Sequence, residues 1–254
     1  MKRFFRYAFQ AAAIVLATMS GQIASAGDFV DFSPARRLIE IDVHAIGGTS
    51  SVFQNYQSKF SQIQDLNVNL GSSIGAGFRA VFGLREWLGL GTALDITTNS
   101  YNIDMTVVGS DNSSMSSVLL DNRTYVATFP VFASFRFNVD KSVRWCVDAG
   151  MYYAYGFAGT QKQRIYRAEI NSMDELVPQL ERVKTDYYHS RATFINGYNR
   201  GDIGLHVATY VNFGPHLMVG ASYQIGMKNS SRPLGVINPS VHNHYFHGIV
   251  GYRF

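Results

Sequence analysis

The sequence predicts an all-β protein, an eight-stranded antiparallel up-and-down transmembrane β-barrel with short periplasmic turns and long external loops. Three observations lead to this prediction. The chain begins with a secretion signal, eight segments alternate apolar and polar residues, and the connections between them are alternately short and long. A period of two residues is typical of strands, and alternating short turns and long loops are typical of bacterial outer-membrane barrels.

The N-terminus has the three parts of a secretory signal peptide. Basic residues precede an apolar stretch from about Ala8 to Met19, and Ala24-Ser25-Ala26 fits an A-x-A processing site. We expect residues 1–26 to be cleaved off after about Ala26, and residues 27–254 to form one barrel domain. A membrane anchor is the alternative, but the apolar stretch is shorter than the ~20 residues of a spanning helix.

Charge and cysteine content exclude several classes of site. The chain has 22 basic and 18 acidic residues, and the signal holds three of the basic ones, so the mature net charge falls from +4 to 19 − 18 = +1. Because no basic cluster stands out, we expect no nucleic-acid partner. Cys146 is the only cysteine, which excludes an internal disulfide and a Cys-based structural zinc site. We expect no cofactor.

The first four predicted strands are Leu38–Ile46, Asn69–Gly83, Leu88–Thr97 and Thr124–Asn138. In the first, apolar side chains from Ile39 to Ala45 share one face, and Glu40, Asp42 and His44 share the other. The fourth has seven apolar positions in step, but Pro130 interrupts it. Since proline removes a ladder donor, we expect a local bulge there.

The other four predicted strands are Trp145–Phe157, Asp202–Phe213, Leu217–Met227 and His242–Phe254. The last is less regular, because Ile249 falls on the otherwise polar face. All eight have about 9 to 15 residues, and a tilted transmembrane strand needs ~9 to 11. Their lengths therefore suit a membrane barrel.

The connections divide into three short turns and four long loops. The turns are residues 84–87, 138–144 and 214–216, and the loops are residues 47–68, 98–123, 160–201 and 228–241. Within the longest loop, Ser172-Met-Asp-Glu175 resembles a capping box that opens a short helix through about Lys184. The stretch from Asn102 to Asn122 is rich in Ser, Asn and Asp and predicts a hydrated loop.

The strand count has one alternative. Ten strands result if Ile103–Val108 and Val118–Leu120 form an additional hairpin rather than extending the third and fourth strands.

Aromatic residues gather near both ends of the predicted strands, as expected of two interfacial girdles. The set on the turn side is Phe82, Trp87, Phe137, Trp145, Phe213, Tyr252 and Phe254, and the set on the loop side is Tyr101, Tyr125, Tyr155 and Phe157. Tyr252 and Phe254 also share one face of the last strand, which suggests a C-terminal membrane-insertion signature. The runner-up fold is a soluble lipocalin-like barrel, but that fold buries its bulky apolar residues, whereas here the polar face is small and rich in glycine.

Several stretches resemble the PorT-like family of small outer-membrane barrels, which is broadly similar to OmpA/OmpX-type eight-stranded barrels. The resemblance lies in Tyr125–Phe137, Asn199–Leu205, Ser222–Asn229 and Gly251–Phe254. It implies a location in the cell outer membrane of a Gram-negative envelope more firmly than a task, since some relatives are linked to protein secretion. Thr128 stands where an acidic residue often precedes the proline of the family, so no role is carried over to that position.

The predicted inner face collects charged and polar side chains, and an eight-stranded barrel is only about wide enough for its own side chains. Such charges must pair, because an unpaired buried ion is costly. We therefore predict a structural polar network in the lumen, formed by Glu40, Asp42, His44, Arg79, Asp95, Arg136, Asp148, Asp202, His206 and Arg253. The alternative is a narrow passive channel.

The histidines and serines near the predicted loops do not form a clear metal or catalytic site. His242 and His244 share a face and His247 lies on the other, which makes a metal site improbable. His189-Ser190 and Ser240-Val-His242 supply the residue types of a lipid-modifying enzyme, but nothing orients either histidine. We expect no enzyme. The expected role is structural, in adhesion or interaction, or accessory to secretion, with outer-membrane lipids, the barrel-assembly machinery and envelope proteins as partners.

Overall fold

The computed structural model describes residues 29–109, 114–170, 176–189 and 194–254. The predicted signal peptide, the capping-box residues Ser172–Glu175 and Ser190 lie outside the described residues. Within the described ranges, no helix has both the length and the hydropathy of a membrane span.

Most of the described chain is β-structure. The one short helix is α2 (Tyr56–Lys59), and the strands are β1 (Ile39–Gln54), β2 (Ile63–Asn69), β3 (Gly71–Gly83), β4 (Leu88–Val108), β5 (Met115–Asp140), β6 (Val143–Ile170), β7 (Leu176–Asp186), β8 (Gly201–Phe213), β9 (Leu217–Gly226) and β10 (Val241–Arg253). The three turns predicted to be short are short, and the predicted fold class is confirmed.

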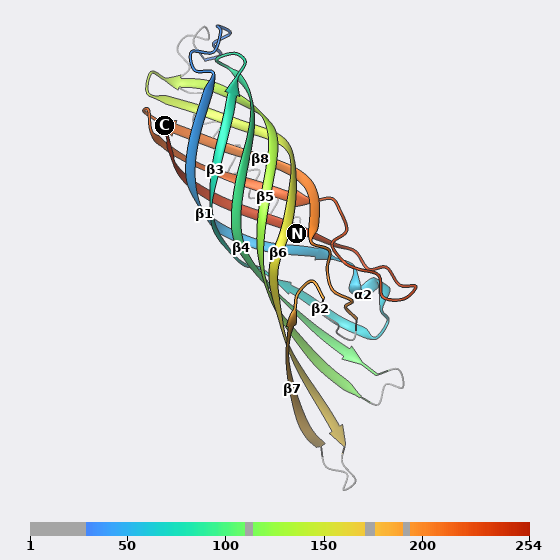
Figure 1. The fold of residues 1–254 in the computed structure, drawn as a ribbon. Helices are drawn as coiled ribbons and strands as arrows, with labels where there is room; N and C mark the ends of the chain where they lie inside the picture. Colours follow the sequence, from blue (N-terminus) through green and yellow to red (C-terminus); the bar gives the residue numbers. More distant parts are fainter. Residues whose placement is uncertain (1–28, 110–113, 171–175, 190–193) are drawn as a thin grey trace.

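Eight of the ten strands close into a ring. The ring runs in chain order through β1, β3, β4, β5, β6, β8, β9 and β10, and every neighbouring pair is antiparallel. β1 closes it against β10, in a register from Asp42 opposite Arg253 to Gln54 opposite Val241. The ring forms an up-and-down barrel whose short turns all lie at one end (Figure 1).

The outer wall of the ring is apolar, as the alternation predicts. Exposed side chains on it include Ile41, Phe78, Leu94, Val131 and Met151. On β6, Trp145 and Phe157 mark the two ends of this wall; at 3.3 Å per residue and a tilt near 40°, they lie about 30 Å apart along the barrel axis. This height matches the hydrocarbon core of a bilayer.

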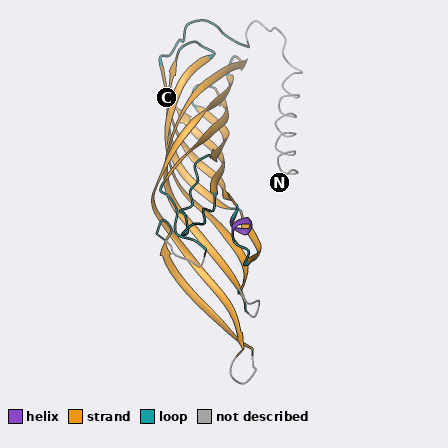
Figure 2. Ribbon diagram, turned by 90° about the vertical axis from the view of Figure 1, so that its right-hand side faces the viewer, coloured by secondary structure: helices purple, strands orange, loops and turns teal. Residues whose placement is uncertain are grey.

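Three strands of the ring continue far beyond it at the loop end. The loop-end halves of β4, β5 and β6, flanked by β2 and β7, form a five-stranded outer sheet in the order β2-β4-β5-β6-β7, which lies at the lower end of the molecule in Figures 1 and 2. The predicted hydrated loop from Asn102 to Asn122 is therefore wrong, because most of it is strand. Ile103–Val108 and Val118–Leu120 extend β4 and β5, and the two strands added to the ring are β2 and β7.

The polarity of the strands inverts above the ring. There most inward side chains are apolar, with Asn122, Gln161 and Gln163 as buried polar exceptions, and most of those on the outer face, such as Asn102, Asp121 and Lys162, are polar or charged. The inward apolar side chains belong to one buried cluster, which we call the cap: Val52, Tyr56, Phe60, Ile63, Tyr101, Ile103, Met105, Val107, Val118, Leu120, Ile165, Tyr187, Tyr188, Phe194, Ile195, Tyr198 and Val241. Water surrounds this part of the chain in place of lipid, so the apolar groups turn inward.

The expected bulge at Pro130 on β5 is wrong. The register does not shift at Pro130; the β4–β5 pairs stop at Thr92 opposite Val131 and resume at Asp95 opposite Thr128 in the same register. The missing proline N–H thus interrupts the ladder without a bulge. The bulge lies instead between Tyr125 and Val126, which pair with Ala158 and Gly156.

Residues 176–184 are not helical. They belong to β7, which pairs with β6 from Thr160 opposite Asp186 to Ile170 opposite Leu176. Pro178 is tolerated because β7 is an edge strand, with only β6 as its partner among the described residues.

For two further residues, the direction of the side chain can be compared with the prediction. Tyr101 is not part of the loop-side girdle, because its ring is buried in the cap and only 4% exposed. Ile249 does face inward, as expected, and is 3% exposed.

Candidate functional site

The lumen of the ring is the candidate site, because it collects most of the polar side chains that the sequence singled out. Nine of those ten residues are buried: Glu40, Asp42, His44, Arg79, Asp95, Arg136, Asp148, Asp202 and His206. Arg253 lies at the turn end, and its side chain is 14% exposed. The buried groups form separate clusters at different heights.

Arg79 on β3 is the centre of the middle cluster. Its Nη1 lies 3.0 Å from Asp42 Oδ2 on β1, and its Nη2 lies 2.8 Å from Asp148 Oδ2 on β6. The guanidinium also stacks on Phe132 and Tyr210, at 5.3 and 5.0 Å from the ring centroids. One side chain therefore connects β3 with four other strands of the ring, β1, β5, β6 and β8.

His44 extends this cluster towards β4. Its Nδ1 lies 3.3 Å from Asp42 Oδ1, and its Nε2 lies 3.0 Å from Asp95 Oδ1. Gly77 leaves the room for this arrangement, since an added Cβ there would collide with both the His44 ring and the Asp95 carboxylate. The glycines of this strand relieve crowding inside the lumen.

A second ionic cluster closes the turn end. Glu40 Oε1 lies 3.1 Å from Arg136 Nη1 and 3.5 Å from Arg144 Nη1, and Glu40 Oε2 lies 3.8 Å from Arg253 Nη1. Arg144 Nη2 continues to Glu86 Oε2 at 3.1 Å.

Arg144 and Glu86 were not among the predicted lumen residues, because both lie in or beside turns, where no alternation reveals which way a side chain points. The N-terminal segment adds a further contact, because the backbone N–H of Arg36 donates to the other oxygen of Glu86.

Asp202 and His206 do not join these ion pairs. The Asp202 carboxylate accepts hydrogen bonds from Tyr152 Oη at 3.2 Å and Asn243 Nδ2 at 2.8 Å, both on Oδ2. Gln224 Nε2 lies 3.2 Å from His206 Nδ1, whose ring packs against Phe132. These two residues line the upper lumen, between the middle cluster and the cap.

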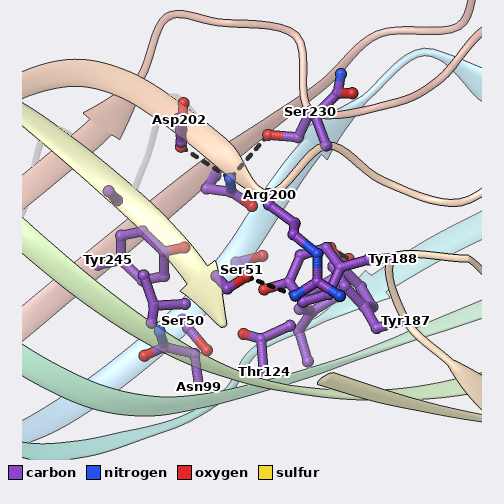
Figure 3. Close-up of a pocket in the computed structure, with 16 residues that line it drawn as sticks. Ser50, Ser51, Asn99, Thr124, Tyr187, Tyr188, Arg200, Asp202, Ser230 and Tyr245 are labelled. Carbon is purple, nitrogen blue, oxygen red and sulfur yellow. Dashed lines mark hydrogen bonds between the residues drawn. The ribbon is translucent and has the colours of Figure 1, made fainter. Parts of the chain in front are cut away.

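A small cavity lies at this level (Figure 3). Polar side chains from several strands and loops point into it, among them Ser50, Asn99, Thr124, Asp202 and Tyr245. The space open to the centre of a water-sized sphere is about 30 Å³. A water molecule needs roughly 10–15 Å³ by this measure, so the cavity holds one to three waters and no larger ligand.

The cap roofs the cavity. Tyr101 and Tyr187 share a hydrogen bond of 2.8 Å, and Tyr187 stacks on Tyr198 with ring centroids 4.3 Å apart. Arg200 lies over the Tyr188 ring at 4.4 Å (Figure 3). Its guanidinium donates to the carbonyl oxygens of Gly156 and Phe157. The cap therefore packs the lumen shut at the loop end.

The remaining candidate groups do not assemble a reactive centre. Across the described residues, no group of three or more His, Cys, Asp or Glu side chains could hold a metal ion. His244 lies on the outer side beside Phe53, with ring centroids 3.5 Å apart, and His247 faces inward to Ser73 Oγ at 2.8 Å. Cys146 is buried, and Asn212 Nδ2 donates to its sulfur at 3.3 Å.

The chain is similar to several solved bacterial structures. Similar chains include Ail, the attachment invasion locus protein of Yersinia pestis in complex with the heparin analogue sucrose octasulfate (11% identity, TM-score 0.38, covering 86% of this chain and 100% of that one). They also include the N-terminal β-barrel domain of Pseudomonas aeruginosa OprF (12%, 0.32, 85% and 97%) and Neisserial surface protein A (12%, 0.34, 84% and 97%). No curated protein matches the chain.

A family model described as an outer membrane protein beta-barrel domain matches residues 32–232. That span contains most of the ring, and the apolar wall and aromatic ends described above suit an outer membrane. The narrower PorT-like resemblance stays a prediction. The chain belongs to the outer membrane protein beta-barrel domain family and resides in the outer membrane.

Proposed function

We propose that this protein is a non-conducting scaffold that holds its outer sheet at the cell surface as an interaction or adhesion surface. One observation carries the proposal: the strands that span the membrane enclose a filled lumen, and three of them, β4, β5 and β6, continue into a five-stranded sheet. Since long connections of such barrels lie outside the cell, the outer sheet and the cap are extracellular.

The lumen argues against the channel alternative. The ion pairs of Arg79 reach from β3 to β1 and β6, and the cluster around Glu40 fills the periplasmic end. The cavity above them is of a size for only a few waters, and the cap packs over it. An ion would have to break buried pairs to pass, which costs several kcal/mol per desolvated charge, on the order of 3–5 kcal/mol for each broken pair.

The arrangement of the loop residues also favours a role other than catalysis. His189 is an exposed side chain 3.6 Å from Asp186, and the backbone of Ser240 is tied to Asn55, with Ser240 N 2.6 Å from Asn55 Oδ1. Neither provides the combination of nucleophile, oriented base and enclosed site that lipid modification requires. Lipid A mass spectra should therefore be unchanged on overexpression, and a new mass would support the enzyme alternative.

The proposed scaffold has three classes of partner: outer-membrane lipids around the ring, the barrel-assembly machinery during insertion, and envelope or secretion-complex proteins at the surface. We infer that residues 1–26 serve as the cleaved signal peptide and residues 27–254 form the mature barrel domain. N-terminal sequencing of protein from outer-membrane fractions tests this boundary, and a mature chain starting at Met1 would contradict it.

Single-channel recording tests the closed lumen. Purified protein, refolded in detergent and added to planar bilayers, should give no stepwise currents. The R79A/R136A variant of this protein is the internal comparison. It lacks two of the side chains that fill the lumen, so it should leak if it folds. Steady unitary currents from the unmodified protein would overturn the proposal, because the clusters would then not block the lumen.

A further inference from the structure

The outer sheet carries a local excess of positive charge that the lumen and the fold do not use. Four basic side chains, which we call the basic quartet, stand on the outer face of β6 and β7: Lys162, Arg164, Arg182 and Lys184. They line a hollow of about 520 Å³, to which Asp121 contributes the single carboxylate.

The register makes the quartet unusual. Lys162 is directly opposite Lys184, and Arg164 is directly opposite Arg182. Like charges directly opposite each other destabilise an antiparallel pair. Two such pairs in consecutive rows on one face are a cost that the fold does not require, because edge protection needs charges on β7 alone.

Few acidic groups compensate the quartet. Arg164 Nη2 lies 3.1 Å from Asp121 Oδ2, and this is the one ion pair of the quartet among the described residues. The mature chain carries a net charge near +1, so the quartet is a local feature and does not follow from an overall basic composition. Its unpaired charge is available to an anionic partner.

The position of the quartet identifies that partner. On the outer face of β5 and β6, Tyr125 and Phe157 meet the lipid, and on β6 Lys162 and Arg164 lie four and six residues beyond Ala158, the partner of Tyr125. At 3.3 Å per residue and a tilt near 40°, the quartet stands roughly 10–15 Å above the apolar band. A phospholipid headgroup layer reaches only about 5–8 Å.

A saccharide headgroup reaches that height, and the next row of the sheet suits one. Tyr166 and Leu180 face each other just above the quartet, with 43% and 45% of each residue exposed. An exposed aromatic ring beside a group of cations can stack on a sugar while the cations bind its phosphates.

We propose that the basic quartet binds the phosphorylated saccharide headgroups of outer-leaflet glycolipids in the membrane that holds the barrel. This inference rests on the proposed function, since it names one partner of the extracellular surface. The bound glycolipid would offset the repulsion across β6 and β7 and would hold this arm of the sheet close to the membrane.

Hydrogen exchange in nanodiscs tests the proposal with the mature chain. Three discs are compared: phosphatidylcholine alone, phosphatidylcholine with 10 mol % bisphosphorylated lipopolysaccharide, and the same with dephosphorylated lipopolysaccharide. Backbone amides of residues 160–167 and 177–186 should exchange several-fold more slowly in the phosphorylated discs than in the other two.

A charge-matched pair of variants identifies the residues responsible. R182Q/K184Q should raise the glycolipid fraction needed for half-maximal protection about thirty-fold, as expected for two lost cation contacts near a membrane surface. K59Q/K228Q removes the same charge from exposed extracellular positions away from this face and should behave as the unmodified protein does. All four substituted positions lie outside the strands of the ring, so both variants should keep the barrel's heat-modifiable gel mobility.

Equal exchange in phosphorylated and dephosphorylated discs overturns the proposal, and this comparison needs no variant. Protection by soluble heparin added to phosphatidylcholine discs, without protection by lipopolysaccharide, also overturns it, because the occupant would then come from outside the membrane. Neither result bears on conductance, so the scaffold proposal stands or falls separately.

Discussion

Replacing Arg79 with methionine should destabilise the barrel more than any other single change to a charged side chain in the lumen. The substitution keeps the aliphatic part of the side chain but removes the guanidinium, which packs on Phe132 and Tyr210, and it leaves Asp42 and Asp148 without that cation. Removing one partner of a buried pair costs about 3–5 kcal/mol, because the other charge remains buried and uncompensated. We therefore expect R79M to lower the free energy of unfolding by at least about 3 kcal/mol.

An exposed ion pair supplies the matched control. Arg164 and Asp121 have side chains 40% and 34% exposed, against 7% for Arg79 and 0% for Asp42. Exposed pairs contribute about 0–1 kcal/mol, so R164M should change the free energy of unfolding by no more than that.

A neutral triple variant separates lost charge from lost packing. D42N/R79M/D148N removes all three charges together, and replacing a whole buried ionic group by neutral residues of similar size often costs little. It should recover most of the stability that R79M loses.

The assay is urea unfolding in lipid vesicles, followed by the fluorescence of Trp87 and Trp145 and by the heat-modifiable gel mobility of the folded barrel. Both tryptophans lie at the turn end, close to the ionic clusters. If R79M and R164M cost the same, or if R79M costs less than about 1 kcal/mol, the reasoning about the lumen is refuted.

Three further predictions concern crowding, insertion and the cap. G77A should cost about 1–3 kcal/mol by overpacking against His44 and Asp95, whereas G47A, with no atom within 4 Å of the added Cβ, should be neutral in the same unfolding assay. F254A should lower the yield of barrel in the outer membrane but barely change unfolding in vitro, since Phe254 is 60% exposed; pulse-chase fractionation that shows normal insertion would contradict the C-terminal signature. Burial raises the pKa of the Tyr187 phenol well above its usual value near 10, so its contribution to stability is complete below about pH 10 and is lost as the pH rises further. Y187F should weaken this alkaline loss in unfolding measured from pH 8 to 12, and an unchanged profile would show that Tyr187 does not contribute.

The membrane-spanning part of the fold could be predicted because lipid and lumen act on opposite faces of every strand. In β1, the apolar side chains from Ile39 to Ala45 alternate with Glu40, Asp42 and His44, so one face meets lipid and the other meets the lumen. The alternation also predicted that the apolar side chain of Ile249 points into the lumen, although the other side chains on that face are mostly polar, and it is buried there.

Above the membrane the same rule misleads, because water replaces lipid outside the strands. Ile103, Met105 and Val107 alternate as clearly as a membrane strand does, but they face inward to the cap. Their polar neighbours made the segment resemble a hydrated loop. The alternation within Ile103–Val107 and at Val118 and Leu120 was the available signal.

β7 could not be predicted from local sequence at all. Pro178 and the acidic residues before it favour a capped, interrupted helix, whereas the strand forms because β6 extends far enough to offer its edge. Long-range pairing of this kind overrides local propensity.

Within the site, the charged residues on strands could be placed by their alternation. Glu86 and Arg144 could not, since turns leave the direction of a side chain open.

Nitroxide scanning along β6 tests the central claim most directly, namely that one strand faces lipid in the ring and water above it. With Cys146 changed to serine, a spin label is placed at each position from 145 to 165 in vesicles. Odd positions from 145 to 157 should collide with lipid-soluble oxygen, and beyond the bulge the even positions 160, 162 and 164 should be reached by a water-soluble nickel chelate. Nickel access to odd positions in the middle of the span, or no change of parity beyond Phe157, would contradict the account.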